Sequence, residues 1–185
     1  MTTTNKILMS EARVSLKDKW GLAVGTNVVF FLISSIGNEV AIVIGGPMQL
    51  GLSIFSLNLA RKKKAEFSQL FDGFKDFGNA LLAYILMAVF VFLWLLLLIV
   101  PGIIAAIAYS QTFFILADNK GLAGNEALKQ SKAMMHGHKW RYFCLCLRFT
   151  GWFILSILTL GIGFLWLAPY FNVSLANFYD DLKKS

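Results

Sequence analysis

The sequence predicts an all-α membrane protein: a single membrane domain over residues 1–185, in which six transmembrane helices form three hairpins and short amphipathic helices lie on the cytoplasmic side. Three observations predict this fold class. Hydrophobic residues make up 57% of the chain, whereas soluble domains are about 45–50% apolar. Charged residues make up only 15%, against about 25% in soluble domains. The apolar residues are concentrated in three blocks, over about 20–60, 78–117 and 140–178.

The clearest block runs from Gly78 to Ala117 and contains no charged residue. A helix rises about 1.5 Å per residue and the bilayer core is about 30 Å thick, so one helix of this length would be about twice too long. The block must therefore cross twice. Pro101 and Gly102 mark the turn, because proline suits the first turn of a helix and glycine tolerates a turn conformation. We expect one helix over about 78–99 and its return over about 101–117.

The first and third blocks are also long enough to cross twice. In the third block we expect the turn at Gly161-Ile162-Gly163. The first block offers two positions, near 37–39 with Pro47 as a kink in the returning helix, or at 45–47. The first position gives helices of about 20 residues, whereas the second leaves only about 14 residues for the return. The first therefore gives the better lengths, and the exact position stays open.

The three blocks also resemble one another. Each begins at a basic residue with an aromatic residue one or two positions later, and each ends on Leu-Ala followed by a polar residue. The steps from Leu59 to Leu116 and from Leu116 to Leu175 are 57 and 59 residues. This spacing indicates three copies of a helical hairpin. The three endings are Leu59-Ala60-Arg61, Leu116-Ala117-Asp118 and Leu175-Ala176-Asn177.

Three polar segments outside the blocks have the period of amphipathic helices, over about 5–18, 66–77 and 125–136. In the second segment five apolar residues recur at i, i+3, i+4 and i+7 spacings, while the acidic residues fall elsewhere. Helices of this kind lie in the membrane interface with their apolar face against lipid. We therefore expect three interfacial helices. The five apolar residues of the second segment are Phe67, Leu70, Phe71, Phe74 and Phe77.

The basic residues predict the orientation. Of the 17 Lys and Arg residues, 16 lie before the first hairpin, between hairpins or after the last one, and the three expected turns carry none. Because cytoplasmic segments are enriched in Lys and Arg, we expect a multi-pass protein of the cell inner (cytoplasmic) membrane with both termini cytoplasmic. The net charge of +7 then indicates contacts with anionic lipid headgroups rather than with nucleic acid.

Known catalytic motifs are absent from the sequence. It contains no H-E-x-x-H, no G-x-S-x-G, no P-loop and no cysteine pairs at zinc spacing. Cys144 and Cys146 are two apart and would lie on opposite sides of a helix. His136 and His138 have no catalytic or ligand partners nearby in the sequence. We expect a protein that is not an enzyme and has no cofactor and no metal.

Charges inside a membrane are costly and therefore point to function. Arg148 lies about eight residues into the fifth expected helix. It either extends back to the cytoplasmic headgroups or faces the bundle interior and binds an acid or an anionic headgroup. Glu39 is the only acid far from the cytoplasmic side. It is either a water-exposed turn residue or a proton or cation site.

Amides in the expected spans form a second group of candidates. Gln49, Gln111 and Asn172 each lie on the second helix of a hairpin. Such residues usually form hydrogen bonds between helices. The alternative is that the three line a shared polar interior, so a common cavity would favour ligand binding or transport over simple packing.

The basic segment Arg61-Lys62-Lys63-Lys64 precedes the Phe-rich amphipathic segment. This pairing favours docking to anionic headgroups on the cytoplasmic face or to a membrane protein partner. Our first hypothesis is accordingly a non-enzymatic accessory or regulatory protein that acts by interaction. The alternative is a small transporter or channel that uses intramembrane polar residues.

Several short motifs resemble a known family. They include Ile99-Val100-Pro101-Gly102-Ile103, Glu126-Ala127-Leu128, Met135-His136-Gly137, Gly151-Trp152 and Phe178-Tyr179. Over nearly the whole chain the pattern resembles a bacterial family of six-helix integral membrane proteins of unknown function. That family is distantly similar to the membrane domain of some glycerophosphoryl diester phosphodiesterases. The resemblance implies a bacterial cytoplasmic membrane and supplies no catalytic residues. No soluble stretch here is long enough for the phosphodiesterase domain, so we expect no such activity.

Overall fold

The computed structural model describes residues 3–35 and 38–184, with the backbone alone for 38–42. Within these ranges all regular structure is helical. In chain order the helices are α1 (Asn5–Leu16), α2 (Trp20–Ser34), α3 (Asn38–Ala60), η1 (Phe67–Asp76), α4 (Phe77–Leu97), α5 (Ile99–Tyr109), α6 (Thr112–Asp118), α7 (Gly124–Met134), α8 (Lys139–Leu158) and α9 (Phe164–Leu182).

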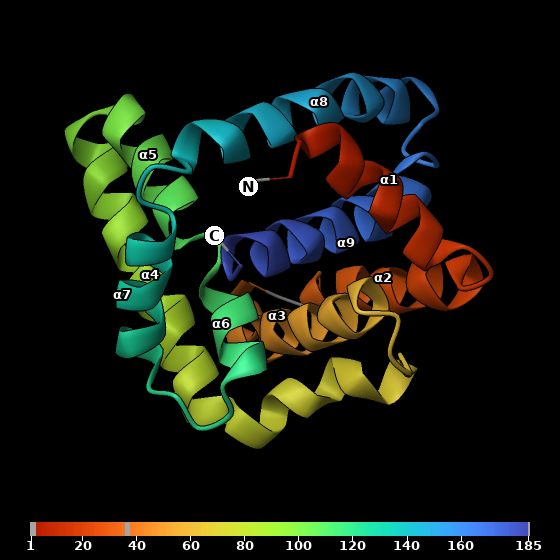
Figure 1. The fold of residues 1–185 in the computed structure, drawn as a ribbon. Helices are drawn as coiled ribbons and strands as arrows, with labels where there is room; N and C mark the ends of the chain where they lie inside the picture. Colours follow the sequence, from red (N-terminus) through yellow and green to blue (C-terminus); the bar gives the residue numbers. More distant parts are fainter. Residues whose placement is uncertain (1–2, 36–37, 185) are drawn as a thin grey trace.

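Helix α9 is the centre of the bundle (Figure 1), where it packs against α1, α2, α3 and α8. Most of its side chains from Leu167 to Leu182 are buried. The hydropathy of the last block did not distinguish this central helix from the others, because a side chain covered by protein and one covered by lipid are equally apolar.

Helix α1 begins and ends close to the expected 5–18, but its apolar face is covered by protein. Leu8, Ala12 and Leu16 are all buried, and α1 packs along α9. The Asn177 side-chain amide of α9 donates to the backbone carbonyl of Leu8 at 3.2 Å. The surface that the sequence assigned to lipid is therefore an internal contact.

The Phe-rich segment is a 3-10 helix, η1, rather than the expected α-helix. Leu70 and Gly73 are buried on the side that packs against α3. The four Phe side chains at positions 67, 71, 74 and 77 remain 37–43% exposed. Because residues three apart are eclipsed in a 3-10 helix, the last three Phe rings form one row, with centroids 6.4–6.5 Å apart. The segment is therefore amphipathic, as the sequence predicts, but its apolar residues follow the period of a 3-10 helix instead of that of an α-helix.

The first break between long helices lies at the earlier of the two expected positions. Helix α3 begins at Asn38 and contains Pro47 in its interior. Gly37, the first residue of the expected turn, lies outside the described residues. Because α3 continues through residues 45–47, the alternative turn there is wrong.

The second break lies at Leu98, whose extended backbone (φ −161°, ψ 142°) separates α4 from α5. Pro101 lies in the first turn of α5, where its missing N–H has no helical partner to lose. At Gly102 a Cβ would lie 2.4 Å from Leu95 Cδ2, so the two helices approach closely there. The third break contains Gly161 at φ +88°, inside the expected turn.

The helix expected over 101–117 is broken at Ser110 and Gln111, between α5 and α6. A side chain of α7 compensates for the break. The Gln111 backbone N–H donates to Ser131 Oγ at 3.2 Å, and the same hydroxyl donates to the Ala108 carbonyl at 2.8 Å. Ser131 therefore satisfies backbone groups that a broken helix leaves unpaired. This contact has no signature in the local sequence, because it joins residues about 20 positions apart.

Four helical runs in the described ranges are long and apolar enough to cross a membrane: Val43–Ala60, Phe67–Leu97, Ile99–Asp118 and Lys139–Leu158. Helix α2 is apolar but has only 15 residues, or about 22 Å of helix. Side chains at the tip of α4 and α5 are strongly exposed and apolar, with Leu96 and Ile99 at 75% and 71%. Large exposed apolar surfaces of this kind are unstable in water and suit a membrane.

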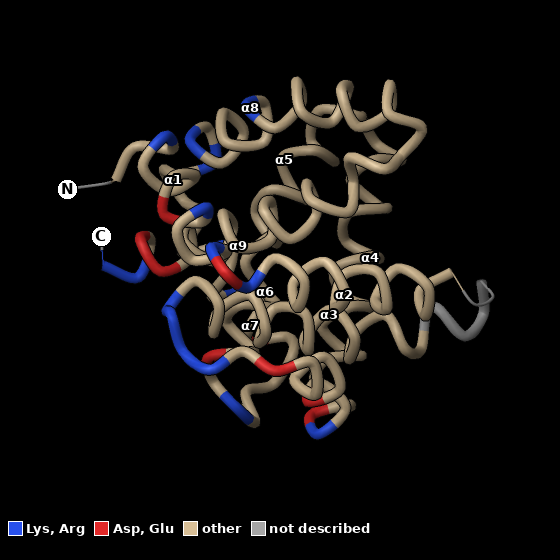
Figure 2. Tube along the Cα trace, turned by 90° about the vertical axis from the view of Figure 1, so that its right-hand side faces the viewer, with Lys and Arg blue, Asp and Glu red and all other residues tan. Residues whose placement is uncertain are grey.

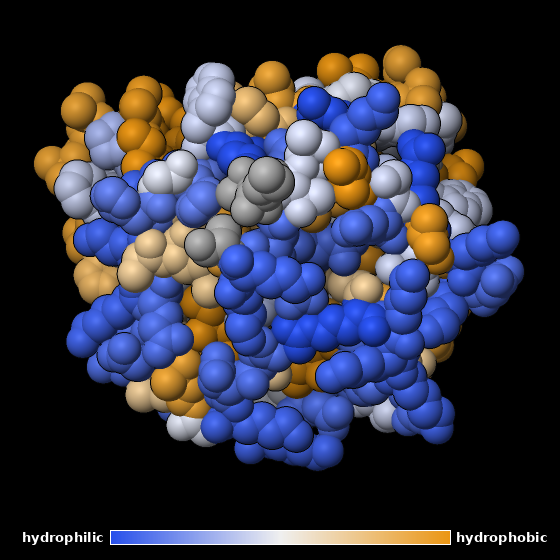
Figure 3. All heavy atoms as spheres, in the orientation of Figure 1, coloured by the Kyte–Doolittle hydropathy of each residue, from blue (hydrophilic) through white to orange (hydrophobic). Residues whose placement is uncertain are grey.

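Charged residues are distributed unevenly over the molecule. Figure 2 shows Lys, Arg, Asp and Glu gathered toward the side where both termini lie and along the lower edge, while the opposite ends of α4, α5 and α8 carry none. Figure 3 shows the face with the termini, which is largely hydrophilic with hydrophobic atoms at its rim. This charged face contains the candidate site.

Candidate functional site

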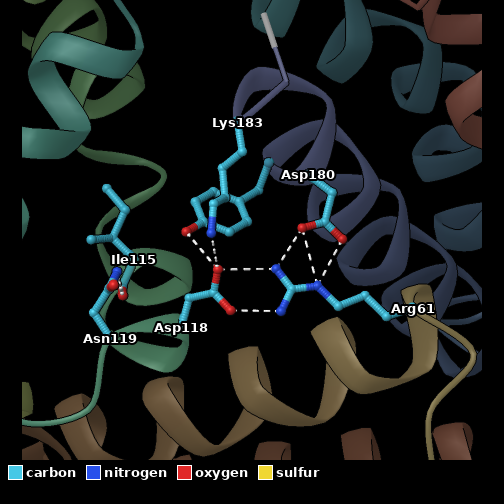
Figure 4. Close-up of polar contacts among 7 residues, drawn as sticks. Arg61, Ile115, Asp118, Asn119, Asp180 and Lys183 are labelled. Carbon is cyan, nitrogen blue, oxygen red and sulfur yellow. Dashed lines mark hydrogen bonds and ion pairs between the residues drawn. The ribbon is translucent and has the colours of Figure 1, made fainter.

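An ion cluster joins the ends of three helices (Figure 4). Arg61 follows α3, Asp118 ends α6, and Asp180 lies in the last turn of α9. Arg61 donates Nη1 and Nη2 to Asp118, at 2.6 and 3.1 Å. It donates Nε to Asp180 Oδ2 at 2.9 Å and Nη2 to Asp180 Oδ1 at 2.5 Å. Lys183 Nζ and the Tyr179 hydroxyl also donate to Asp118, at 2.5 and 3.3 Å. One guanidinium thus holds two carboxylates from distant parts of the chain.

Electrostatics reinforce this cluster. The hydrogen bonds that the Arg61 guanidinium donates to Asp180 and then to Asp118 raise the pKa of Arg61 above its ordinary value. Burial, together with the Asp118 charge, raises the pKa of Tyr179, so its hydroxyl stays protonated and can donate. The side chains of Arg61, Asp118 and Asp180 are only 25%, 14% and 23% exposed. The cluster is therefore well shielded from solvent.

The repeat seen in the sequence places two members of the cluster. Arg61 and Asp118 occupy the polar position after Leu-Ala in the first and second copies. In the third copy Asn177 occupies that position, and Asp180 lies three residues further along α9. The segments that follow the three Leu-Ala pairs therefore meet in space, and the Arg61 guanidinium joins the first of them to acids of the other two.

A second ion pair involves Asp181, the residue after Asp180 in α9. The Asp181 carboxylate pairs with Arg141 Nη2 at 2.6 Å and accepts the Thr3 backbone N–H at 3.2 Å. Burial alone would raise the pKa of Asp181, but the hydrogen bonds from Thr3 and Arg141 outweigh it and lower this pKa. The Asn5 amide donates to the Arg141 carbonyl at 2.9 Å. The start of α8, the end of α9 and the N-terminal segment are held together here.

The basic segment separates into two parts. Arg61 turns inward to the ion cluster, whereas Lys62, Lys63 and Lys64 are exposed. Lys62 has φ +55° and ends α3 in a left-handed turn, with the Lys63 N–H bonded to the Asn58 carbonyl at 2.8 Å. Lys64 pairs with Glu66 at 2.6 Å. In the described part of the chain Lys62 and Lys63 have no carboxylate partner. Three of the four predicted docking residues are thus available at the surface.

Of the two candidate intramembrane residues, Arg148 and Glu39, the structure describes the side chain of Arg148. Arg148 is exposed on α8 and makes no ion pair with the described residues. The side chain of Glu39 lies outside the described residues. The position of Arg148 fits the interpretation in which its side chain extends to headgroups. Among the described residues no group of three or more His, Cys, Asp and Glu is placed to hold a metal ion.

The interior amides converge only in part. Gln49 and Asn172 line one cavity of about 590 Å³. The Asn172 amide nitrogen also donates to Asn27 Oδ1 at 3.0 Å, so it connects two helices as well. Gln111 is fully buried beside the cavity and donates Nε2 at 3.0 Å to the hydroxyl of Ser110, which lines it. Asn172 therefore connects two helices and also lines the cavity, whereas Gln111 does not line it.

Comparison with known proteins gives a family but no activity. The model of a family described as "Protein of unknown function (DUF975)" matches residues 1–107 and again residues 95–185. The chain belongs to this family. No curated protein and no solved structure matches it. The DUF975 match confirms the resemblance to a family of unknown function, while the similarity to the phosphodiesterase membrane domain and the bacterial origin stay predictions.

In this DUF975 member, three site residues were not predicted from the sequence: Asp118, Asp180 and Asp181. A signal was present, because the chain has only 10 acidic residues and two of them are adjacent at the end of α9. An acid next to an apolar helix in a basic protein is a candidate for ion pairing. Which base it meets cannot be derived from spacing, since Arg61 and Asp180 are 119 residues apart.

Proposed function

We propose that this protein is a non-enzymatic integral membrane protein that acts by interaction, as an accessory or regulatory protein of the bacterial inner (cytoplasmic) membrane. The observation that carries the proposal is the uneven distribution of charge: charged residues gather on the face that holds both termini, while the outward surfaces of α4, of α5 and of α8 beyond Arg148 are apolar. By the positive-inside rule the charged face is cytoplasmic. Both termini are then cytoplasmic.

Three contacts support six crossings arranged as three hairpins. Lys19, before α2, donates to the Lys63 carbonyl after α3 at 3.3 Å. Asp76, before α4, accepts the backbone N–H of Gly121 after α6 at 3.2 Å. Arg141, near the start of α8, pairs with Asp181 near the end of α9. Each apolar block thus begins and ends on one face, which requires an even number of crossings. The short α2 and the central α9 complete the first and third pairs.

The proposed docking surface consists of Lys62, Lys63, Lys64 and the exposed Phe row of η1. The Phe rings are suited to the boundary between headgroups and acyl chains. The ammonium groups of the three lysines are suited to anionic headgroups. Arg61 is excluded from this surface because two carboxylates occupy its guanidinium. The partners are anionic lipid and, on the same surface, a membrane protein with an acidic juxtamembrane segment.

Replacing Lys62, Lys63 and Lys64 together with Gln is expected to lower the share of anionic lipid that co-purifies in mild detergent. Each Lys near an anionic surface contributes about 1 kcal/mol, so the enrichment of anionic over zwitterionic lipid should fall at least several-fold. Lipid mass spectrometry of the purified protein measures the ratio. The matched control replaces the exposed Lys120, Lys129 and Lys132. An equal fall in both variants, or none in the first, would contradict a local docking surface.

A small transporter or channel is the second candidate, and the cavity shared by Gln49 and Asn172 favours it. If a solute passes through this cavity, Gln49→Leu should lower its flux into proteoliposomes by about tenfold, because an amide hydrogen bond in a dry site contributes on the order of 1 kcal/mol and leucine also narrows the path. Arg148→Gln should leave the flux unchanged, since Arg148 does not line the cavity. A panel of small polar solutes with no flux through the unmodified protein would count against transport.

A further inference from the structure

The cavity of about 590 Å³ lies between two parts of the bundle. Side chains of α4 and α5 form one wall, and side chains of α3 and α9 form the other. In Figure 1 these pairs lie on the left and at the centre of the view. Tyr142 of α8 and two Phe side chains of α6 complete the lining. The volume is within the range of about 300–1,000 Å³ that is typical of small-molecule sites.

The polar side chains of the lining lie toward the charged face and at the middle of the helices, and the far end of the lining is apolar. Ser56 is four residues from the end of α3, and Ser110 is eight residues from the end of α6, or about 6 and 12 Å of helix. Tyr142 is three residues after the start of α8. Val91 and Leu95 line the cavity near the opposite end of α4. The cavity therefore has the polarity of an amphiphile, with the polar end toward the charged face.

None of the side chains that line the cavity is charged. The Gln49 amide and the Ser56 hydroxyl have no side-chain hydrogen-bond partner in the described part of the chain. In an apolar environment, uncharged donors and acceptors stabilise a hydroxyl, ester or amide, whereas an ionised headgroup would remain uncompensated. The lining thus selects an uncharged polar group.

The break between α5 and α6 adds to this argument. It places the Ser110 hydroxyl in the cavity wall, where the Gln111 amide donates to it. Interrupted helices recur at ligand sites of membrane proteins, because irregular backbone at that depth is tolerated where it lines a cavity. Ser131 satisfies the backbone groups at the break, and the break brings the Ser110 hydroxyl to the cavity wall.

We propose that this cavity binds an uncharged amphiphile of the monoacylglycerol type. Its hydroxyl and ester groups bond to Gln49, Ser56 and Asn172, and its acyl chain lies against Val91 and Leu95. The site is separate from the lysine docking surface and does not depend on it.

Binding of radiolabelled monooleoylglycerol to the purified full-length protein in mild detergent tests the proposal, with oleate as the charged probe of the same chain. Saturable binding of monooleoylglycerol at least tenfold tighter than that of oleate is expected. The variant with Lys62, Lys63 and Lys64 changed to Gln should bind both probes like the unmodified protein, so failure of the docking proposal would not affect this result.

Two variants locate the binding. Ala106→Leu fills the cavity from an exposed wall position and should weaken monooleoylglycerol binding by tenfold or more. Gln49→Leu removes one hydrogen bond worth on the order of 1 kcal/mol and should weaken binding by about fivefold. Ala133→Leu, on the exposed side of α7, is the matched control and should have no effect. Thermal unfolding of each variant shows that the fold is kept.

Three outcomes would overturn the proposal. The first is binding of monooleoylglycerol that does not saturate. The second is binding of oleate as tight as that of monooleoylglycerol, because the cavity has no charge to compensate a carboxylate. The third is an Ala106→Leu protein that unfolds normally and still binds monooleoylglycerol with unchanged affinity.

Discussion

Replacing Arg61 with Leu is expected to lower the free energy of unfolding by about 2–4 kcal/mol. The change leaves the Asp118 and Asp180 carboxylates facing one another without the guanidinium that joins them. The expected loss lies below the upper end of the range for fully buried pairs, because these side chains keep 14–25% exposure. Lys183 also compensates part of the Asp118 charge. Thermal and denaturant unfolding in detergent measure the loss.

Two further variants test whether the loss of stability comes from the ion cluster. Lys62→Leu changes the next residue, which is exposed, and should alter stability by less than about 0.5 kcal/mol. Arg61→Lys keeps the charge but cannot hold two carboxylates in a bidentate manner, so its stability should lie between those of the unmodified and Leu proteins. Equal unfolding of the Arg61→Leu and Lys62→Leu proteins would show that the cluster does not hold the bundle together.

Replacing Gly51 with Ala is expected to destabilise the protein by about 3 kcal/mol or more. A Cβ at this position would lie 1.8 Å from the Leu70 carbonyl oxygen. Since that oxygen belongs to the backbone of η1, it cannot move as a flexible side chain can, and the helices must separate. Gly73 on η1 meets the Pro47 carbonyl in the same way, at 1.9 Å. The same unfolding measurements apply.

Gly25→Ala is the matched control, because Gly25 also lies in an apolar helix but a Cβ there meets nothing within 4 Å. Alanine is favoured over glycine in a helix by about 1 kcal/mol, so this variant should be neutral or slightly more stable. If both alanine proteins unfold alike, the close contact of α3 with η1 is not required for the fold.

The ion cluster and the cavity are connected through the helices that they share. Arg61, Asp118 and Asp180 lie at the ends of α3, α6 and α9, and all three helices line the cavity. The cluster therefore sets the distance between cavity walls at their charged ends. If the cavity binds an amphiphile, the Arg61→Leu protein should bind it less tightly although Arg61 does not line the site.

The sequence by itself determined the elements that depend on local composition and length. The block Gly78–Ala117 had to contain two helices because of its length, and the structure breaks it at Leu98, close to the expected Pro101. The periodic segment near the N-terminus became α1, and the basic residues gathered on the side of the termini. Each of these features follows from neighbouring residues, which hydropathy and charge patterns describe well.

Only the tertiary structure decided which apolar faces meet protein and which remain outside. The faces of α1 and α9 are covered within the bundle, and the Phe row of η1 is not. Hydropathy cannot separate these cases, because lipid tails and leucine side chains are equally apolar. The contact of Arg61 with Asp118 and Asp180 likewise joins residues 57 and 119 positions apart. Such pairs depend on how the helices pack, and no local pattern along the chain encodes that packing.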